Sequence, residues 1–324
     1  MDNYSQSTHC CADCGGVAGG GAGLKACTSC RLVKYCNVKC QKNHWKKHKK
    51  VCKQRAAELR DEALFKEPPL KEDCPICYLP MPVKLIACMT LTPATISSVP
   101  IYDYAEANEE VANIGTETYY SCCGKSICKG CVDSFRKSGN IGICPFCNAM
   151  TGGKTNAEIV EELMKRVKVN DAGAIYVLGN DYHNGSEGLQ QDQEKALELW
   201  TRAAELGSST AHFALGLYYR AGGDLTKAKF HYEAAAMAGN EGARNNLGNM
   251  EYRSGKRERA VKHLIIAASA GCYNAMQNLL DLFKHDLVSL DEIESTLTAY
   301  NNSCAEMRSE SRDKYISKLK GPRE

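Results

Sequence analysis

The sequence predicts a multidomain protein in which two small cysteine-rich modules are followed by an all-α solenoid of helix-pair repeats. Seventeen of the 19 cysteines lie in residues 1–147. Beyond about Asp171 the chain has almost no cysteine and repeats itself in steps of 32 residues after a first step of 37. A chain of 324 residues is long enough for two or three domains.

The distribution of cysteines favours zinc over disulfides. Residues 1–10 lack the basic start and apolar core of a signal peptide. No apolar run reaches the roughly 18 residues of a membrane span. We therefore expect a cytoplasmic or nuclear protein and no membrane partner. Thiols stay reduced in these compartments, where dense C-x-x-C pairs bind zinc.

The charge of the chain is unevenly distributed. Residues 1–60 contain 12 Lys and Arg against 3 Asp and Glu, a balance of +9, although the net charge of the whole chain is +3. A basic end can attract nucleic acid or acidic protein surfaces. We favour a solvated basic helix beside a zinc site, and we do not expect nucleic acid as the main partner.

The first module, residues 1–56, contains four pairs of metal ligands. The pairs are Cys11/Cys14, Cys27/Cys30, Cys36/Cys40 and His48/Cys52. Eight such ligands are the number that two closed tetrahedral zinc sites require. A segment this short and rich in glycine cannot bury a hydrophobic core of its own. Metal binding must therefore supply the free energy of its folding. The last two pairs have helical spacing, which predicts a helix from about Val38 to Glu58.

The run CTSCRLVKYCNVKCQKNHWKKHKKVC, residues 27–52, resembles the second half of a MYND zinc finger. In that family the ligand pairs interleave. The resemblance implies that one zinc ion is held by Cys11, Cys14, Cys36 and Cys40, and the other by Cys27, Cys30, His48 and Cys52.

The same resemblance implies a role in binding proteins. MYND fingers are protein-interaction modules, and several take short proline-containing peptides. The peptide groove of the family uses a glutamine and a tryptophan, which match Gln41 and Trp45. Packing of Trp45 against the zinc knuckle is the alternative.

A linker helix is expected at residues 57–72, followed by a second module at 73–150. Its ligands are Cys74/Cys77, Cys122/Cys123, Cys128/Cys131 and Cys144/Cys147. Lys125 occupies the position where the common cross-braced finger has a histidine, and a protonated lysine cannot ligate zinc. Adjacent cysteines in a tight turn can both reach one metal, and Gly124 supplies backbone freedom there. The alternatives are an incomplete site completed by water, or recruitment of Cys88.

With CPIC at 74–77 and CPFC at 144–147, this module resembles an all-cysteine RING finger. Cross-bracing implies one zinc ion on Cys74, Cys77, Cys128 and Cys131, and another on Cys122, Cys123, Cys144 and Cys147. We thus expect about four zinc ions per chain. RING fingers commonly dock ubiquitin-conjugating enzymes through residues that match Ile76 and Pro145.

Two departures weaken the expectation of ligase activity. Asn148 follows the last ligand, where active RING fingers often carry an arginine, and no tryptophan lies between Cys131 and Cys144. The first loop of the module is also long. Residues of about 84–116 are turn-rich and lack periodicity, which indicates a mobile insertion.

A linker is expected at 151–170 and a repeat region at 171–324. Leu178, Leu215, Leu247 and Leu279 recur in phase with the large residues Trp200, Tyr232 and Leu264 and with paired alanines. This pattern predicts stacked helix pairs. It resembles Sel-one-like repeats, a variant of the tetratricopeptide repeat, whose concave face binds partners. We expect three full repeats, a degenerate fourth and a polar capping helix near 290–320.

The order of the three regions resembles a multidomain family known mainly from algal genomes, with the same SCCGK-x-x-C-x-G-C run. The expected function is a zinc-binding adaptor whose MYND finger captures a peptide and whose repeats bind a second protein. The alternative is a RING-type ubiquitin ligase, in which the other regions select substrates. No phosphate-binding loop or catalytic triad suggests another enzyme.

Overall fold

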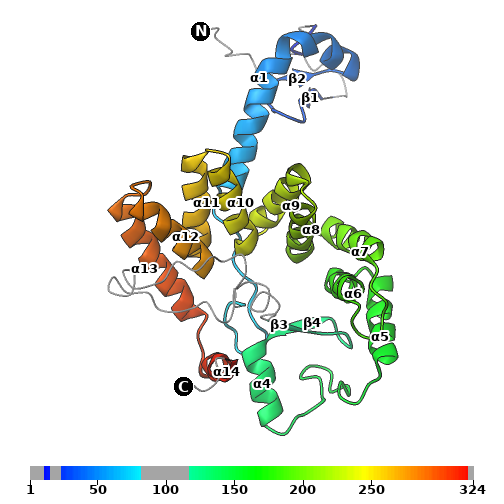
Figure 1. Ribbon diagram of the computed structural model, residues 1–324. Coiled ribbons are helices and arrows are strands. Elements are labelled where there is room, and N and C mark those ends of the chain that lie inside the picture. Colours follow the sequence, from blue (N-terminus) through cyan, green and yellow to red (C-terminus); the bar gives the residue numbers. More distant parts are fainter. Residues whose placement is uncertain (1–10, 15–22, 82–116, 320–324) are drawn as a thin grey trace. The chain divides into compact units, whose positions relative to one another are not determined.

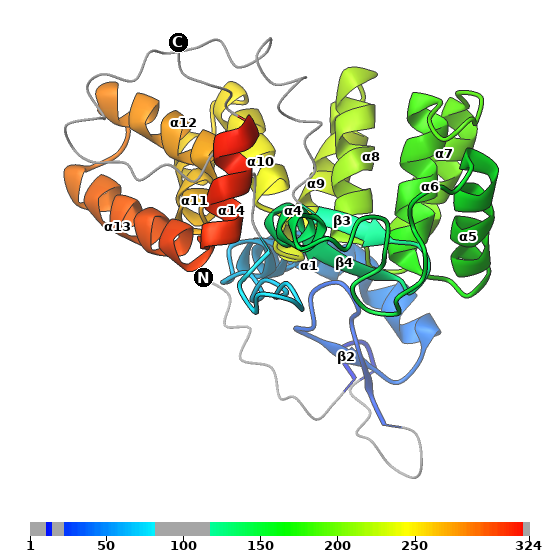
Figure 2. The same cartoon turned by 90° about the horizontal axis from the view of Figure 1, so that it is seen from below.

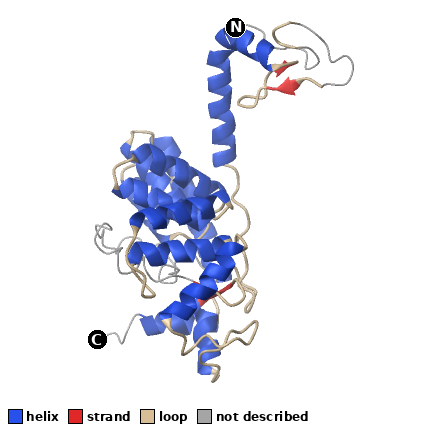
Figure 3. Ribbon diagram, turned by 90° about the vertical axis from the view of Figure 1, so that its right-hand side faces the viewer, coloured by secondary structure: helices blue, strands red, loops and turns tan. Residues whose placement is uncertain are grey.

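The computed structural model describes residues 11–14, 23–81 and 117–319, and it is mainly helical (Figure 3). The predicted insertion at 84–116, with Cys88, lies outside the described residues. The chain divides into two compact units, Met1–Lys66 and Glu67–Glu324, called here the N-terminal and C-terminal units. Among the described residues, no helix is long and apolar enough to cross a membrane.

The N-terminal unit consists of a small hairpin and one long helix. Strands β1 (Lys25–Ala26) and β2 (Lys34–Tyr35) pair antiparallel, and helix α1 spans Val38–Leu64. Asn37 caps the helix, because its side-chain oxygen accepts a hydrogen bond of 2.9 Å from the Cys40 amide. The helix is six residues longer than the predicted end at Glu58 and includes the first part of the predicted linker helix.

In the C-terminal unit, residues 73–81 and 117–150 form the second cysteine-rich module. Strands β3 (Glu117–Tyr120) and β4 (Lys125–Cys128) form an antiparallel hairpin, and helix α4 (Lys129–Lys137) follows directly. Gly124 ends the hairpin turn with φ +72°. A Cβ atom at this position would lie 2.6 Å from the Asp171 carboxylate, so the turn requires glycine.

The repeat region consists of antiparallel helix pairs (Figure 1). The first helices of the pairs are α6 (Ala172–Asn184), α8 (Ser209–Ala221), α10 (Glu241–Arg253) and α12 (Tyr273–Lys284). The second helices are α7 (Gln193–Glu205), α9 (Leu225–Met237), α11 (Arg257–Ser269) and α13 (Leu290–Glu306). The prediction of an all-α repeat region is therefore confirmed.

The glycine after each repeated leucine makes room for the large residue of the partner helix. A Cβ atom on Gly179 would lie 2.7 Å from the Trp200 ring, and one on Gly216 would lie 2.5 Å from the Tyr232 ring. Leu264 occupies the same place against Gly248. In the fourth pair, the positions 32 residues later are Leu280 and Thr296, which reverses the small and large residues. This reversal explains why the fourth repeat is degenerate in sequence.

Two predicted segments beyond residue 150 differ from the structure. The predicted linker 151–170 contains helix α5 (Asn156–Lys168), which begins with a capping box at Thr155 and Glu158. Its Leu163 and Val167 are buried in the core of the first repeat, so α5 is part of the solenoid. The predicted single capping helix is divided into α13 and α14 (Glu310–Leu319), and α14 packs against α4 of the cysteine-rich module (Figure 2).

The cysteine-rich module and the segment that precedes it, residues 67–72, are bound to the repeats at several places within the C-terminal unit. The Tyr119 hydroxyl donates a hydrogen bond of 2.8 Å to Asp171, the capping residue of α6. The Lys71 ammonium donates 2.6 Å to the carbonyl of Ala270 and forms an ion pair of 2.9 Å with Glu241. Residues 67–72 are therefore an extended segment held on the repeats instead of the helix expected there.

Candidate metal centres and peptide-binding helix

The structure brings all 16 predicted metal ligands into four groups, each with its ligand atoms within 4.8 Å of one another. The groups are Cys11, Cys14, Cys36 and Cys40; Cys27, Cys30, His48 and Cys52; Cys74, Cys77, Cys128 and Cys131; and Cys122, Cys123, Cys144 and Cys147. They are called sites 1 to 4 in this order. Thiolates and one imidazole in sets of four fit tetrahedral zinc.

Three of the C-x-x-C pairs share one local backbone geometry. The backbone N–H of the residue after the second cysteine donates a hydrogen bond to the carbonyl of the first cysteine. Examples are the bonds from Tyr78 N to Cys74 O (2.8 Å) and from Asn148 N to Cys144 O (3.1 Å). The residue after the second cysteine is left-handed in each case, with φ +57° at Arg31, +53° at Tyr78 and +56° at Asn148. Asparagine tolerates this conformation well. The presence of asparagine at position 148 therefore has a structural explanation that does not involve ubiquitin.

Sites 1 and 2 lie between the hairpin and α1 of the N-terminal unit. The sulfurs of Cys36 and Cys40 are 3.4 Å apart, and those of Cys27 and Cys52 are 3.7 Å apart. His48 Nε2 lies 3.2 Å from the Cys30 sulfur. These separations fit ligands placed about 2.0–2.3 Å from a common zinc ion.

His44 supports site 2, although sequence reasoning missed it. Its ring stacks on the ligand His48, with centroids 5.7 Å apart, and its Nδ1 lies 3.0 Å from the Tyr35 hydroxyl. Its spacing could have indicated this role, because His44 lies four residues after Cys40 and four before His48, on the same face of the helix.

Sites 3 and 4 lie in the C-terminal unit. In site 4 the sulfurs of Cys123 and Cys144 are 3.7 Å apart, and those of Cys122 and Cys147 are 3.5 Å apart. The adjacent cysteines therefore both reach the same group, with no place for Lys125. The Lys125 ammonium instead lies over the Phe146 ring, 4.8 Å from its centroid.

The electrostatic surroundings lower the pKa of several buried cysteine ligands, of which Cys128 and Cys11 show the largest shifts. A hydrogen bond from Cys131, supported by the Arg312 guanidinium, lowers the pKa of Cys128 to about 4 despite burial. Burial alone would raise the pKa of Cys11, but the backbone N–H groups of Cys14 and Cys36 outweigh it and lower the pKa to about 6. Metal ligands must be deprotonated, so these two thiols are prepared for metal binding, whereas the hydrogen bond with Cys128 raises the pKa of its neighbour Cys131.

The predicted protein-contact residues are at least partly accessible. Trp45 is 41% exposed on α1, and Gln41 lies one turn earlier with partial exposure. Trp45 is therefore accessible to a ligand, and its packing against the zinc knuckle stays an alternative. Ile76 is 42% exposed in the first knuckle of the second module, and Pro145 is partly exposed in the last.

These features define a protein that combines cysteine-rich fingers with a helical repeat region. Residues 11–52 match the family model of the MYND finger. Residues 172–208, 209–240 and 242–272 match that of the Sel1 repeat. The predicted MYND finger and three full Sel-one-like repeats are thus confirmed, whereas the RING-like interpretation of 73–150 stays a prediction.

Two solved structures resemble the chain. One is c5321, a protective antigen of uropathogenic Escherichia coli with an SLR fold, which is 24% identical over 52% of this chain and 41% of that chain, with a TM-score of 0.39. The other is a Sel1 repeat protein from Oxalobacter formigenes, which is 22% identical over 55% of this chain and 72% of that chain, with a TM-score of 0.43. The chain thus spans less than half the length of the first.

Proposed function

We propose that the protein is a zinc-dependent interaction adaptor that captures a short proline-containing peptide on its MYND finger. The observation that carries this proposal is the exposure of Trp45 on a helix that also bears metal ligands. Cys40 precedes it by five residues and His48 follows it by three, so zinc binding would hold this part of the helix rigid. A rigid aromatic ring loses little entropy on binding.

The chemistry of this helix face suits a proline-containing ligand. The Trp45 ring can stack on a proline ring, and the Gln41 amide can bond to the extended backbone of a peptide. Lys46, Lys47, Lys49 and Lys50 are all exposed nearby. They would attract acidic residues that flank the peptide motif, and salt would weaken this attraction.

The repeats supply the second binding surface of the proposed adaptor. Sel1 repeats are protein-interaction modules, and large apolar side chains remain exposed on several of their helices. Phe230 on α9 and Tyr252 on α10 are examples. We expect a protein partner there, separate from the peptide of the finger.

Replacing Trp45 tests the peptide site. Trp45→Ala is expected to weaken binding of proline-containing peptides by roughly thirtyfold, because truncating an aromatic hot spot costs about 2 kcal/mol. The binder would first be selected from a peptide library on the zinc-loaded protein, and its affinity measured by calorimetry. Leu32→Ala removes another exposed apolar side chain of the same unit and should leave binding unchanged. A library without proline-containing binders, or equal binding by Trp45→Ala, would refute the proposal.

Counting the metal tests the four candidate centres. Native mass spectrometry is expected to find about four zinc ions per chain, one for each ligand group. Cys122→Ser and Cys123→Ser should each weaken or abolish one of them. Cys88→Ser is the control and should leave the count unchanged, because none of the four groups needs Cys88. A count near three for the unmodified protein would contradict the joint role of Cys122 and Cys123.

The second candidate function is a RING-type ubiquitin ligase. The observation that favours it is the accessibility of Ile76, at the position that contacts conjugating enzymes in RING fingers. An autoubiquitylation assay with a panel of conjugating enzymes distinguishes the two functions. Activity that is lost in Ile76→Ala would favour the ligase, and inactivity with the whole panel would favour the adaptor.

A further inference from the structure

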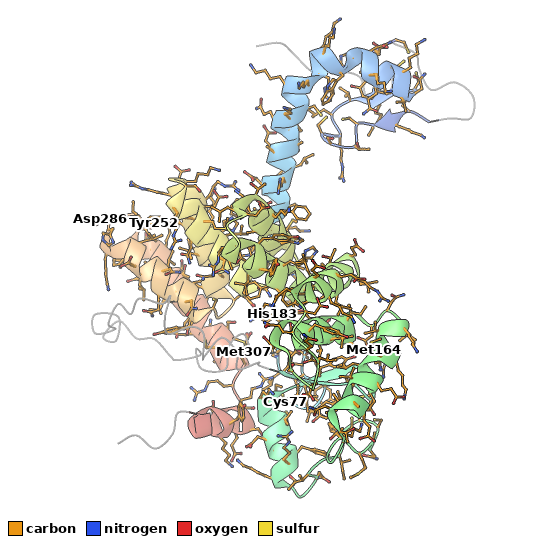
Figure 4. The ribbon with its side chains drawn as sticks, turned by 45° about the vertical axis from the view of Figure 1, so that its right-hand side comes forward. Cys77, Met164, His183, Tyr252, Asp286 and Met307 are labelled. Atoms are coloured by element: carbon orange, nitrogen blue, oxygen red, sulfur yellow. The ribbon has the colours of Figure 1, made fainter. Side chains whose placement is uncertain are left out.

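Arg312, on helix α14, contacts two ligands of site 3 although it is distant from them in the sequence. Its side chain is fully buried, with only 1% of the residue exposed. Its Nε donates a hydrogen bond of 3.3 Å to the Cys128 sulfur, and its Nη2 donates one of 3.4 Å to the Cys77 sulfur. The remaining N–H groups donate to the carbonyls of Leu79, Pro80 and Met307. Figure 4 labels Cys77 and Met307, two of these partners.

These contacts satisfy the hydrogen-bond donors of the guanidinium but do not balance its positive charge. Within the described part of the chain, Arg312 has only carbonyl oxygens and sulfurs as partners, and no carboxylate. A buried cation without a counter-charge is strongly destabilising. A zinc ion held by four thiolates carries a formal charge of about −2 and would supply that counter-charge.

Helix α14 packs on α4 (Figures 1 and 2). This packing brings the Arg312 guanidinium to the site. A Cβ atom on Gly130 would lie 2.7 Å from the Cα atom of Arg312, so the two helices approach as closely as a glycine allows. An arginine also lies beside site 4, but it makes other contacts than Arg312 makes at site 3. Arg166 donates to the backbone carbonyls of Ser121 and Cys122 and not to a sulfur.

We propose that Arg312 is a positioning residue for the zinc ion of site 3, and that zinc binding there is coupled to docking of the C-terminal helix α14. Zinc in the tetrathiolate site stabilises the buried guanidinium, and the guanidinium stabilises the excess negative charge of the zinc–thiolate group. The coupling is reciprocal: loss of zinc releases α14, and loss of α14 weakens zinc binding. This inference rests on the zinc occupancy of site 3 within the proposed function.

The test uses the full-length, zinc-loaded protein and measures zinc release to a chromogenic chelator. In Arg312→Met, which removes the charge, one of the zinc ions is expected to leave at least roughly tenfold faster, because partners of metal ligands typically contribute 10–100-fold to affinity. Arg312→Lys keeps the charge without the forked donors and should restore slow release in part. Arg308→Met removes a neighbouring, exposed arginine and should release zinc like the unmodified protein.

Hydrogen exchange of residues 310–315 provides a second measurement that does not depend on a variant. Their amides are expected to lose protection when zinc is removed from the unmodified protein and to regain it when zinc returns. Unchanged protection, or zinc release from Arg312→Met at the unmodified rate, overturns the coupling while leaving the zinc count and peptide capture intact. If the protein binds no zinc at site 3, the zinc proposal for that site fails as well, and the zinc count shows this directly.

Discussion

Removing zinc with a strong chelator is expected to unfold the finger of the N-terminal unit. Among the described residues of this finger, the buried core cluster consists of metal ligands and two other apolar residues, Val33 and Tyr35. So small a core cannot offset the conformational entropy of the ordered chain. Structural zinc ions contribute about 10 kcal/mol or more each to folding, so their removal should eliminate the folded state of this region.

The repeats are expected to keep their helices under the same treatment. Their cores are formed by leucine, alanine and aromatic side chains, as in the cluster that includes Leu178, Trp200 and Leu215, and contain no metal ligand. Hydrogen exchange detected by mass spectrometry separates the two regions in one experiment. Protection should disappear at residues 25–52 and persist at 173–283, and added zinc should restore it. Persistent protection of the finger without metal would show that zinc is not its source of stability.

The ligand groups and the repeats could be predicted because their signals are local. Each C-x-x-C pair closes a turn of a few residues, and the 32-residue period records which helix faces are buried. The grouping of pairs came from resemblance and not from spacing, because nothing near Cys36 indicates that it joins Cys11 instead of Cys27. The same holds for Cys122 and Cys123, for which the number of ligands and the tight turn at Gly124 favoured a shared site without identifying the other ligands of that site.

The contacts that bind the second module to the repeats could not be predicted. Arg312 meets Cys128 across 184 residues and Lys71 meets Ala270 across 199, and each is an ordinary surface residue type in its own segment. Helix α5 was missed for another reason. Its residues 156–168 are helical and partly apolar, but they precede the first match to the repeat motif and were therefore assigned to a linker. Its capping box at Thr155 was the overlooked signal.

Acidification is expected to destabilise the repeats through His263. This residue is fully buried on α11, and burial, followed by the charges of Arg244 and Arg259, lowers its pKa to about 3. Lys229 acts in the same direction, and Glu251 opposes it. In the unfolded chain a histidine titrates near pH 6.5. Between these two values the unfolded chain binds a proton that the folded protein does not, so the free energy of unfolding falls as the pH falls.

The loss attributable to His263 should approach 1.4 kcal/mol per pH unit, or about 2–3 kcal/mol between pH 6.5 and 4.5. The urea midpoint of the helical signal, measured across this range, reports it. His263→Gln cannot take up the proton, so its midpoint should depend less on pH, whatever its stability at neutral pH. His285→Gln, which changes an exposed histidine after α12, should retain the full pH dependence. Zinc release at low pH affects all three proteins alike, so the difference between their slopes isolates His263. Equal slopes for His263→Gln and the unmodified protein would show that this histidine does not control the acid stability of the repeats.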